Sequence, residues 1–453
     1  MFLVHYFSSP LVQETLYGEV GSFPILGLHL EQRQDFAISL SGGEWGHSSD
    51  ILSKDIASLW IRRDCHVSQE TVQAFVAQAK KRTSDVDIVV ARITGRFGNL
   101  LSELRFGEHG PLLFWTSESI DIEEFLPVFQ KVVADNKNTS QDDVLLVELA
   151  NKNWRWCWSD IDPVEKIYPM PVSRYQFGVD LIEIPLSDFI LLPTGHWMQL
   201  LWVNLLSLGP FLYRELLGRS FGEVVVNLTT VFFKTFSFDP LTLGLQLRRV
   251  GKNVKIHPSA VVEACWIGDD VRIGANAVVR GCVLGKGVKV EDLALVEFST
   301  LSAGTIIQRQ AMVKFSVINK NCGVGGVIQL GVMDEGALIK RGSYLMDMSL
   351  AEGGVSILYN GIKFGVPLGL GGCAVGTRST LGCGVRVAAG RFVPAFAQVI
   401  ADVDQSLLKI SKDIMRISEE KIQVLERSQH QDEDFEEPKQ TVLICKSGGL
   451  EEL

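Results

Sequence analysis

Two aspartates, Asp160 and Asp162, have the type and spacing that metal-assisted chemistry needs. They follow the strand-like run Trp154–Trp158, and a second acidic pair, Asp85 and Asp87, precedes another apolar run. Carboxylates grouped at the end of a strand can hold Mg²⁺ beside the phosphates of a substrate. Acids at such positions also occur as exposed loop residues without a ligand. The sequence leaves both interpretations of these aspartates open.

Histidine is the usual general base of acyl transfer, and its distribution in this chain is uneven. The chain has eight histidines, but none lies between Val262 and Asp402. His257, next to Pro258, is the histidine closest to that stretch. We therefore take His257 as a candidate base, with an ordinary surface residue as the alternative.

Glycines and cysteines could also build a site. Gly42 and Gly43 are the nearest match to a phosphate-cradling loop in the first part of the chain, although no Arg or Lys lies close by. A plain turn is the alternative for them.

The eight cysteines contain no CxxC pair, which predicts free thiols in a reducing compartment, and hence a cytoplasmic protein. We predict no metal site.

A seventeen-residue repeat from Val250 to about Leu330 shows which elements must position these residues. Each repeat divides into steps of six, six and five. Three apolar columns run through it: Val250, Ile267, Leu284, Leu301 and Ile318; Ile256, Ile273, Val290, Ile307 and Val324; Val262, Val279, Val296, Val313 and Leu330. This spacing fits neither an α-helix nor an alternating strand, and it predicts a left-handed parallel β-helix with three short strands per coil. Cys265, Cys282, Ser299 and Ser316 also lie one repeat apart, which predicts a ladder of small residues.

We place the β-helix over residues 250–400, with an interruption. Regular spacing stops near Leu330 and resumes at Leu370, so we expect residues 331–365 to form an excursion loop. Within it, the segment Ile357-Leu-Tyr-Asn-Gly-Ile-Lys-Phe364 predicts a β-hairpin, because Asn-Gly favours a type I′ turn.

The rest of the chain divides by pattern. Residues 1–185 alternate strand-like and helix-like segments, which predicts an α/β domain with a helix capped by Ser68. Residues 186–249 are apolar and mostly helical. The stretch Trp197–Tyr213 inside them is interrupted by Pro210 and is short for a membrane span, so we expect a buried helix. We predict a C-terminal helix over 401–427 and an acidic, partly disordered tail over 428–453.

The composition of the chain limits the classes of partner that it can bind. The formal charge is −10 and the sequence has no long run of Lys or Arg, which argues against a nucleic-acid partner. With 46% hydrophobic residues, the chain can bury a sizeable core. The flat faces of the predicted β-helix favour packing around a three-fold axis, so we expect a homotrimer.

The order of these parts resembles bacterial sugar-1-phosphate nucleotidylyltransferase-like proteins with a C-terminal hexapeptide β-helix. Beyond the repeat, the segment His196-Trp-Met-Gln-Leu-Leu-Trp-Val-Asn204 is similar to the Pro-Trp-x-Leu-Leu-x-x-Asn linker of that group. The run from Gly372-Cys-Ala-Val-Gly376 to Ala389-Gly-Arg-Phe-Val-Pro394 looks like its closing coils, and Leu59-Trp60-Ile61 before the Ser68 helix is a further match. The resemblance implies a degenerate nucleotidyltransferase-like α/β domain before the β-helix, a nucleotide-sugar ligand, and Mg²⁺ if that domain is active.

Three functions follow as hypotheses. The first is a nucleotidylyltransferase-like enzyme of nucleotide-sugar or envelope-polysaccharide metabolism. Active members carry a Gly-x-Gly-x-Arg loop near the N-terminus, and the first forty residues lack it. The second is a non-catalytic trimeric scaffold or regulatory binding protein. The third is a hexapeptide acyltransferase, for which the coils lack an internal histidine.

Overall fold

The chain forms two compact units, Met1–Glu215 with Ala351–Leu370, and Leu216–Leu350 with Gly371–Leu453. The computed structural model describes residues 3–7, 24–25, 28–29, 34, 44–45, 57–82, 84–108, 110–118, 120, 122–149, 152–171, 181–217, 222, 225, 229, 246–348, 354–359, 361–401, 442–446 and 449–452. Each unit is described by itself.

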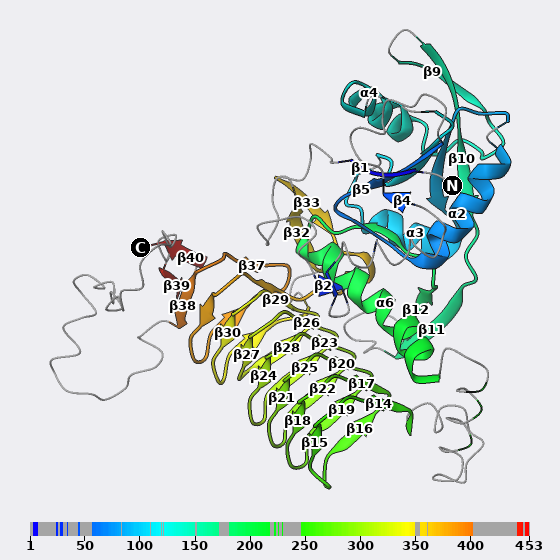
Figure 1. Ribbon diagram of the computed structural model, residues 1–453. Coiled ribbons are helices and arrows are strands. Elements are labelled where there is room, and N and C mark those ends of the chain that lie inside the picture. The colour runs from blue at the N-terminus through cyan, green and yellow to red at the C-terminus, as the bar shows by residue number, and fades with distance from the viewer. Residues whose placement is uncertain are drawn as a thin grey trace, which may run out of the picture. The chain divides into compact units, whose positions relative to one another are not determined.

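A mixed sheet of seven strands forms the centre of the first unit, in the order β4-β1-β5-β8-β7-β10-β9 (Figure 1). Its strands are β1 (Leu3–Phe7), β4 (Glu44–Trp45), β5 (Ser58–Arg62), β7 (Ile88–Ile93), β8 (Leu113–Thr116), β9 (Leu145–Leu149) and β10 (Lys152–Ile161). Strand β8 runs antiparallel to both of its neighbours, whereas β10 runs parallel to β7. The carboxyl ends of β7 and β10 therefore meet at one edge of the sheet.

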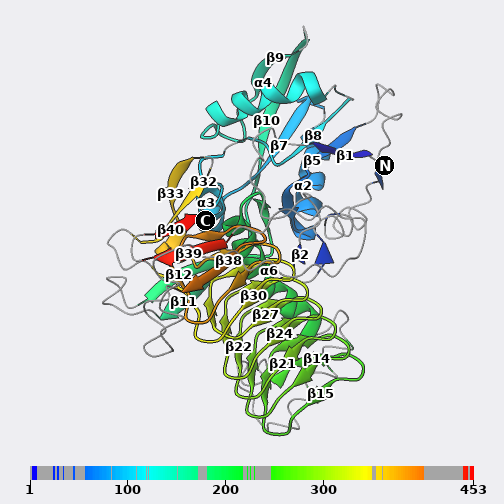
Figure 2. The same cartoon turned by 90° about the vertical axis from the view of Figure 1, so that its left-hand side faces the viewer.

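Helices cover both faces of this sheet, as the pattern of alternating segments predicts. Helix α2 (Gln69–Arg82) packs on one face through Phe75, and Val89 of β7 belongs to the same apolar cluster. Helix α4 (Ile122–Asp135) packs on the other face through Phe129, with Val90 in its cluster (Figure 2). Successive side chains of β7 thus pack into the hydrophobic cores on opposite faces of the sheet, as the two-residue period of a strand requires.

Local signals explain the helix starts. The Ser68 hydroxyl accepts a hydrogen bond from the Thr71 N–H at 3.4 Å, which confirms the predicted cap of α2. The unit also contains α3 (Gly95–Glu103) and all of α6 (Trp197–Leu217) but its last two residues. Small strand pairs are formed by β2 (Pro24–Ile25) with β3 (Leu28–His29), β6 (Cys65–Val67) with β13 (Leu191–Pro193), and β11 (Lys166–Pro171) with β12 (Leu181–Leu186).

Helix α6 contains the stretch Trp197–Tyr213, so the predicted helix is confirmed. Among the residues that the structure describes, no helix is both long and apolar enough to cross a membrane.

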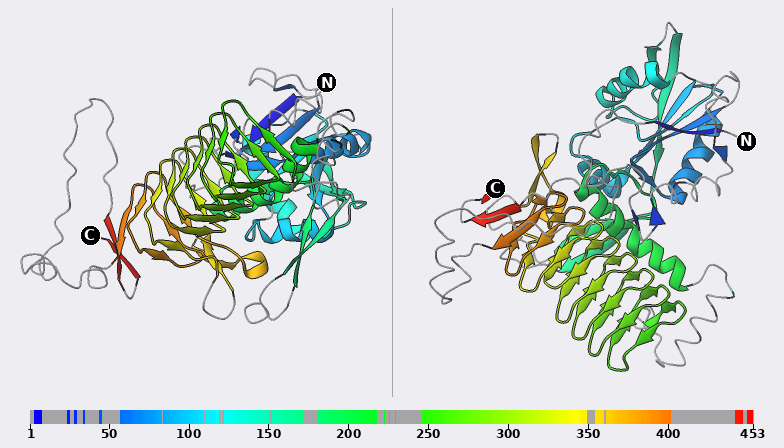
Figure 3. Two further views of the ribbon diagram at one scale, coloured as in Figure 1. Left: turned by 90° about the horizontal axis from the view of Figure 1, so that it is seen from below. Right: turned by 60° about the vertical axis from the view of Figure 1, so that its left-hand side comes forward.

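The second unit is a left-handed parallel β-helix with three sheets, seen from the side in Figure 3. The first sheet holds β14 (Arg248–Val250), β17 (Cys265–Ile267), β20 (Val283–Leu284), β23 (Thr300–Leu301), β26 (Val317–Ile318), β29 (Val332–Met333), β34 (Ala374–Val375) and β37 (Phe392–Val393). The second holds β15 (Lys255–Ile256), β18 (Arg272–Ile273), β21 (Lys289–Val290), β24 (Ile306–Ile307), β27 (Gly323–Val324), β30 (Leu338–Ile339), β35 (Thr380–Leu381) and β38 (Gln398–Ala401). The third holds β16 (Val261–Glu263), β19 (Val278–Arg280), β22 (Leu295–Glu297), β25 (Met312–Lys314), β28 (Val327–Gln329), β31 (Tyr344–Leu345) and β36 (Arg386–Val387).

The observed register confirms the first two predicted columns throughout and the third as far as Val313. The prediction that Leu330 follows Val313 is wrong, because Val313 pairs with Ile328. A two-residue corner, Gly325-Gly326, shortens this coil, and a Cβ on Gly326 would collide with the Ser343 carbonyl oxygen. Only glycine permits so tight a corner.

The same short coil explains why the predicted excursion begins too early. Strands β29, β30 and β31 continue the coils up to Leu345, inside the predicted excursion 331–365. The segment that leaves the coils is Ala351–Leu370, and it belongs to the first unit. It contains the predicted hairpin, β32 (Ser356–Tyr359) paired with β33 (Ile362–Gly365), and a short 3₁₀ turn at Pro367–Gly369.

The predicted small-residue ladder is confirmed. Cys265, Cys282, Ser299 and Ser316 are all fully buried, and the Ser316 N–H donates to the Ser299 hydroxyl at 3.0 Å. Burial raises the pKa of the Cys282 thiol, as expected for an inert thiol inside a prism.

Near the C-terminus, β39 (Val442–Lys446) pairs in parallel with β38 and extends the second sheet, and β40 (Gly449–Glu452) follows it. The predicted helix over 401–427 and the acidic part of the tail over 428–453 lie outside the described residues, apart from Ala401 and these two strands.

Candidate functional site

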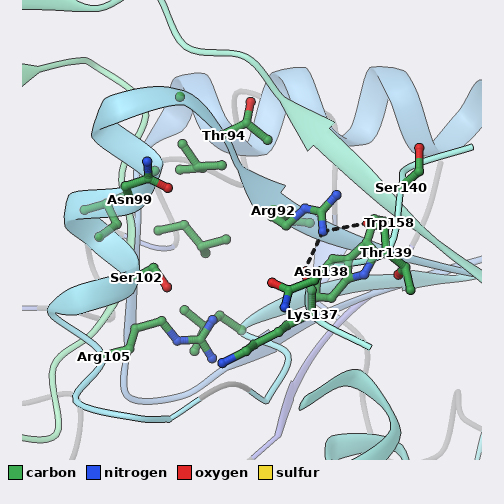
Figure 4. Close-up of a pocket in the computed structure, with 17 residues that line it drawn as sticks. Arg92, Thr94, Asn99, Ser102, Arg105, Lys137, Asn138, Thr139, Ser140 and Trp158 are labelled. Atoms are coloured by element: carbon green, nitrogen blue, oxygen red, sulfur yellow. Dashed lines mark hydrogen bonds between the residues drawn. The ribbon is translucent and has the colours of Figure 1, made fainter. Parts of the chain in front are cut away.

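A cavity of about 600 Å³ opens in the first unit where β7 and β10 end (Figure 4). Open α/β sheets commonly bind ligands at the carboxyl ends of parallel strands, because loops and helix starts there leave polar groups unpaired. The polar side chains that line it are Arg92, Thr94, Asn99, Ser102, Arg105, Lys137, Asn138, Thr139, Ser140. Helix α3 lines one side of the cavity, and the loop after α4 lines the other.

Asp160 lies beside this cavity, and a salt bridge holds its carboxylate. The parallel register pairs Arg92 of β7 with Asp160 of β10. The Arg92 guanidinium donates to both Asp160 oxygens, at 2.6 and 2.8 Å, and also to the Thr139 carbonyl at 3.0 Å. The guanidinium stands 4.7 Å from the centre of the Trp158 ring. Asp160 therefore orients Arg92 and leaves this arginine nearly neutralised.

Helix α3 begins at the cavity, and a carboxylate from its own unit already occupies its first turn. The Phe97 N–H donates to the Glu165 carboxylate at 2.7 Å. Gly95 has a φ of +78°, and a Cβ at this position would collide with Glu165. The favourable position for an anion at the helix N-terminus is thus filled by Glu165. A ligand must use the side chains further along the helix.

Arg105, just after α3, is the least compensated charge of the cavity. Its guanidinium donates to the Gly110 carbonyl, and its buried Nε has no hydrogen-bond partner in the described part of the chain. No carboxylate of a described residue forms an ion pair with it. Burial and the nearby Arg62 cation together lower the pKa of Arg105 to about 9. Arg62 itself is paired with Asp64 at 2.6 Å and with Glu108.

The lining of the cavity is strongly biased in charge. Among the described residues that line it, three are basic, Arg92, Arg105 and Lys137, and none is acidic. This is unusual for a chain with a formal charge of −10. Cations gathered in a concave site focus the electrostatic field and attract anions. The cavity can therefore hold an anionic group against Arg105 and Lys137.

His257 lines a different, shallow groove of about 460 Å³ on the second sheet of the β-helix. Its Nδ1 accepts a hydrogen bond from the Ser259 N–H at 3.2 Å and lies 2.8 Å from the Ser259 hydroxyl. An imidazole whose Nδ1 accepts carries its proton on Nε2 when neutral. The exposed ring nitrogen is then a donor, which does not favour a general base at this position.

Few of the candidate site residues predicted from the sequence lie at this cavity. Asp162 is exposed in the loop after β10, and Gly42 and Gly43 lie outside the described residues. Over the ranges given above, no three His, Cys, Asp or Glu side chains gather as metal ligands do. Sequence reasoning missed Arg92, Asn99 and Arg105, although a polar Thr94-Gly95 pair directly after a buried strand was a usable signal.

Comparison with known proteins identifies the repeat. Residues 249–281 match the family model described as bacterial transferase hexapeptide (six repeats). Among solved structures, a hexapeptide transferase family protein from Anaplasma phagocytophilum is 20% identical, with 33% of this chain and 77% of that chain covered and a TM-score of 0.18. A putative acetyltransferase from Bacillus cereus is 15% identical, with 33% and 76% covered and a TM-score of 0.14. No curated protein matches the chain.

Proposed function

We propose that the first unit binds a phosphorylated ligand, a sugar phosphate or nucleotide, in the cavity at the ends of β7 and β10. The observation that carries this proposal is Arg105, a partly buried cation that has no carboxylate partner among the described residues, in a cavity whose described lining residues include no acid. A phosphate would supply the negative charge that Arg105 lacks, and charge-assisted bonds of this kind are strong.

The side chains support binding better than nucleotidyl transfer. Transfer with Mg²⁺ needs carboxylates that are free to face the metal. The Asp160 carboxylate is instead held in a salt bridge by Arg92, and Asp162 lies exposed in its loop. We therefore favour a binding or regulatory protein of nucleotide-sugar metabolism, with the degenerate nucleotidyltransferase-like domain as its sensor. In this role, Mg²⁺ is not required for binding.

Thermal-shift and calorimetric titration of the full chain with inorganic pyrophosphate test the proposal. We expect saturable binding with and without Mg²⁺, and a loss of at least tenfold in affinity in Arg105→Gln. Arg386→Gln is the matched control, because Arg386 is exposed on the coils. Absence of binding to the unmodified chain, or equal affinity in Arg105→Gln and Arg386→Gln, would refute the proposal.

A hexapeptide acyltransferase is the second candidate, supported by the family match over residues 249–281 and by the groove beside His257. It predicts that acyl-CoA stabilises the chain and that His257→Gln abolishes acyl transfer. The orientation of the His257 ring speaks against this role.

We also propose a homotrimer in the cytoplasm, because regular β-helix faces pack readily around a three-fold axis. A sedimentation experiment that shows a stable monomer at micromolar concentration would contradict the trimer.

A further inference from the structure

A second cavity of about 450 Å³ continues the first one along α3. Asn99 and Ser102 line both cavities. With Glu103 they form one polar face of the helix, at the spacing of three and four that puts side chains together. All three are exposed, and their side chains have no hydrogen bond or ion pair with any residue that the structure describes. This face is thus free to serve a ligand that spans both cavities.

The excursion hairpin forms the far wall of the second cavity. Phe364 and Gly365 of β33 line it together with Phe106 and Gly107. The Phe364 and Phe106 ring centroids lie 6.1 Å apart, with the ring planes inclined by 48°. Phe364 is only half-buried, so part of its ring faces the cavity.

Two ring contacts of Tyr359 hold the hairpin in place without involving Phe364. Tyr359 packs on Phe106, with centroids 6.0 Å apart, and edge-on against His196 at 5.4 Å. Gly107 has a φ of +82°, and a Cβ there would come within 3.2 Å of the Phe364 ring. The glycine therefore lets Phe364 approach the loop after α3. The excursion is built to place an aromatic ring at this cavity.

An aromatic wall beside a polar helix face is the chemistry that recognises a nucleobase. A base stacks on an aromatic side chain, and amide or carboxylate groups bond to its edge. The Glu103 carboxylate is acceptor-only, and it matches the adjacent N1–H and N2–H donors of guanine. The neighbouring cationic cavity would receive the phosphates of the same molecule.

We propose that the ligand is a nucleoside diphosphate, with its diphosphate at Arg105 and Lys137 and its base against Phe364, at the polar face of α3. This inference rests on the proposed anion site and adds the class of ligand. The proposal gives the excursion a function. The hairpin, an insertion between coils of the β-helix, would determine which ligands the first unit prefers.

Calorimetry with GDP and with inorganic pyrophosphate separates the two proposals. We expect GDP to bind at least tenfold more tightly than pyrophosphate. Phe364→Ala should remove most of this difference and leave pyrophosphate affinity unchanged. Phe364→Tyr should restore it, because the ring remains. Ile362→Ala is the matched control, since Ile362 lies in the same strand with its side chain 60% exposed.

The outcomes distinguish the failures. Pyrophosphate binding with no gain for GDP overturns the nucleobase subsite and keeps the anion site. A gain for GDP that survives Phe364→Ala overturns the role of the hairpin. Hydrogen exchange of the hairpin amides checks that Phe364→Ala leaves the hairpin docked through Tyr359. If neither compound binds, the anion site itself is refuted, and this inference fails with it.

Discussion

Acid should undock the excursion hairpin through His196, a buried neutral histidine at the start of α6. Its Nδ1 accepts the Met198 N–H at 3.2 Å, so the neutral ring carries its proton on Nε2, and the ring also bonds to the Leu358 backbone. The ring is 7% exposed and packs edge-on against Tyr359. Burial lowers the pKa of His196 from 6.5 to about 4.

The sign and size of the effect follow from linkage. In an undocked state in which water fully surrounds the ring, His196 binds a proton below pH 6.5, whereas the docked state binds it only near pH 4. The undocked state therefore binds more protons between these values, and docking weakens as the pH falls through this window. The loss is at most about 2 kcal/mol at pH 5 and about 3 kcal/mol at pH 4, taking about 1.4 kcal/mol per pKa unit.

Hydrogen exchange of the hairpin amides, corrected for the intrinsic exchange rate at each pH, measures this loss. We expect the protection of residues 356–365 to fall by up to about 20-fold between pH 7 and pH 5, which corresponds to about 1.8 kcal/mol. His196→Gln should flatten this dependence, because the amide can still accept the Met198 N–H but does not titrate. His257→Gln, at an exposed histidine of the coils, should retain it. An equal fall in protection in His196→Gln and the unmodified chain would refute the reasoning.

Two further predictions separate the charge and the shape of the site. Asp160→Asn should raise the affinity for pyrophosphate several-fold, because it frees Arg92 from its salt bridge. Asp162→Asn should leave this affinity unchanged. A loss of affinity in Asp160→Asn would instead indicate that Asp160 binds a metal. Gly107→Ala should destabilise the first unit by about 1–3 kcal/mol, measured by urea unfolding, and displace Phe364, because φ is +82° and the ring is close. Gly384→Ala has a similar φ of +73° with open space around it, so it should cost less and leave GDP affinity intact.

The β-helix was predictable because each coil repeats the same local rule. Ile256, Ile273 and Val290 recur at a fixed spacing in the sequence, and the same residues pair with one another in successive coils. The prediction failed at Gly325-Gly326, where two residues are missing from one corner and the period shifts. The hairpin was also predictable, because Asn-Gly specifies its turn from adjacent residues.

The candidate site was not predictable in the same way, because its residues meet only through sheet register and helix packing. Asp160 was singled out, but only the parallel register of β10 on β7 shows that it pairs with Arg92. In the sequence, Arg105 resembles an ordinary surface arginine, and only the fold places it partly buried in this cavity. No local pattern connects Phe364 with α3 across more than 250 positions of sequence.

A crystal structure of the full chain with GDP tests the central claim most directly. The account predicts diphosphate density against Arg105 and Lys137, in the cavity where β7 and β10 end. It also predicts the guanine ring on Phe364. An empty cavity at saturating GDP, or GDP seated only in the groove beside His257, would contradict it.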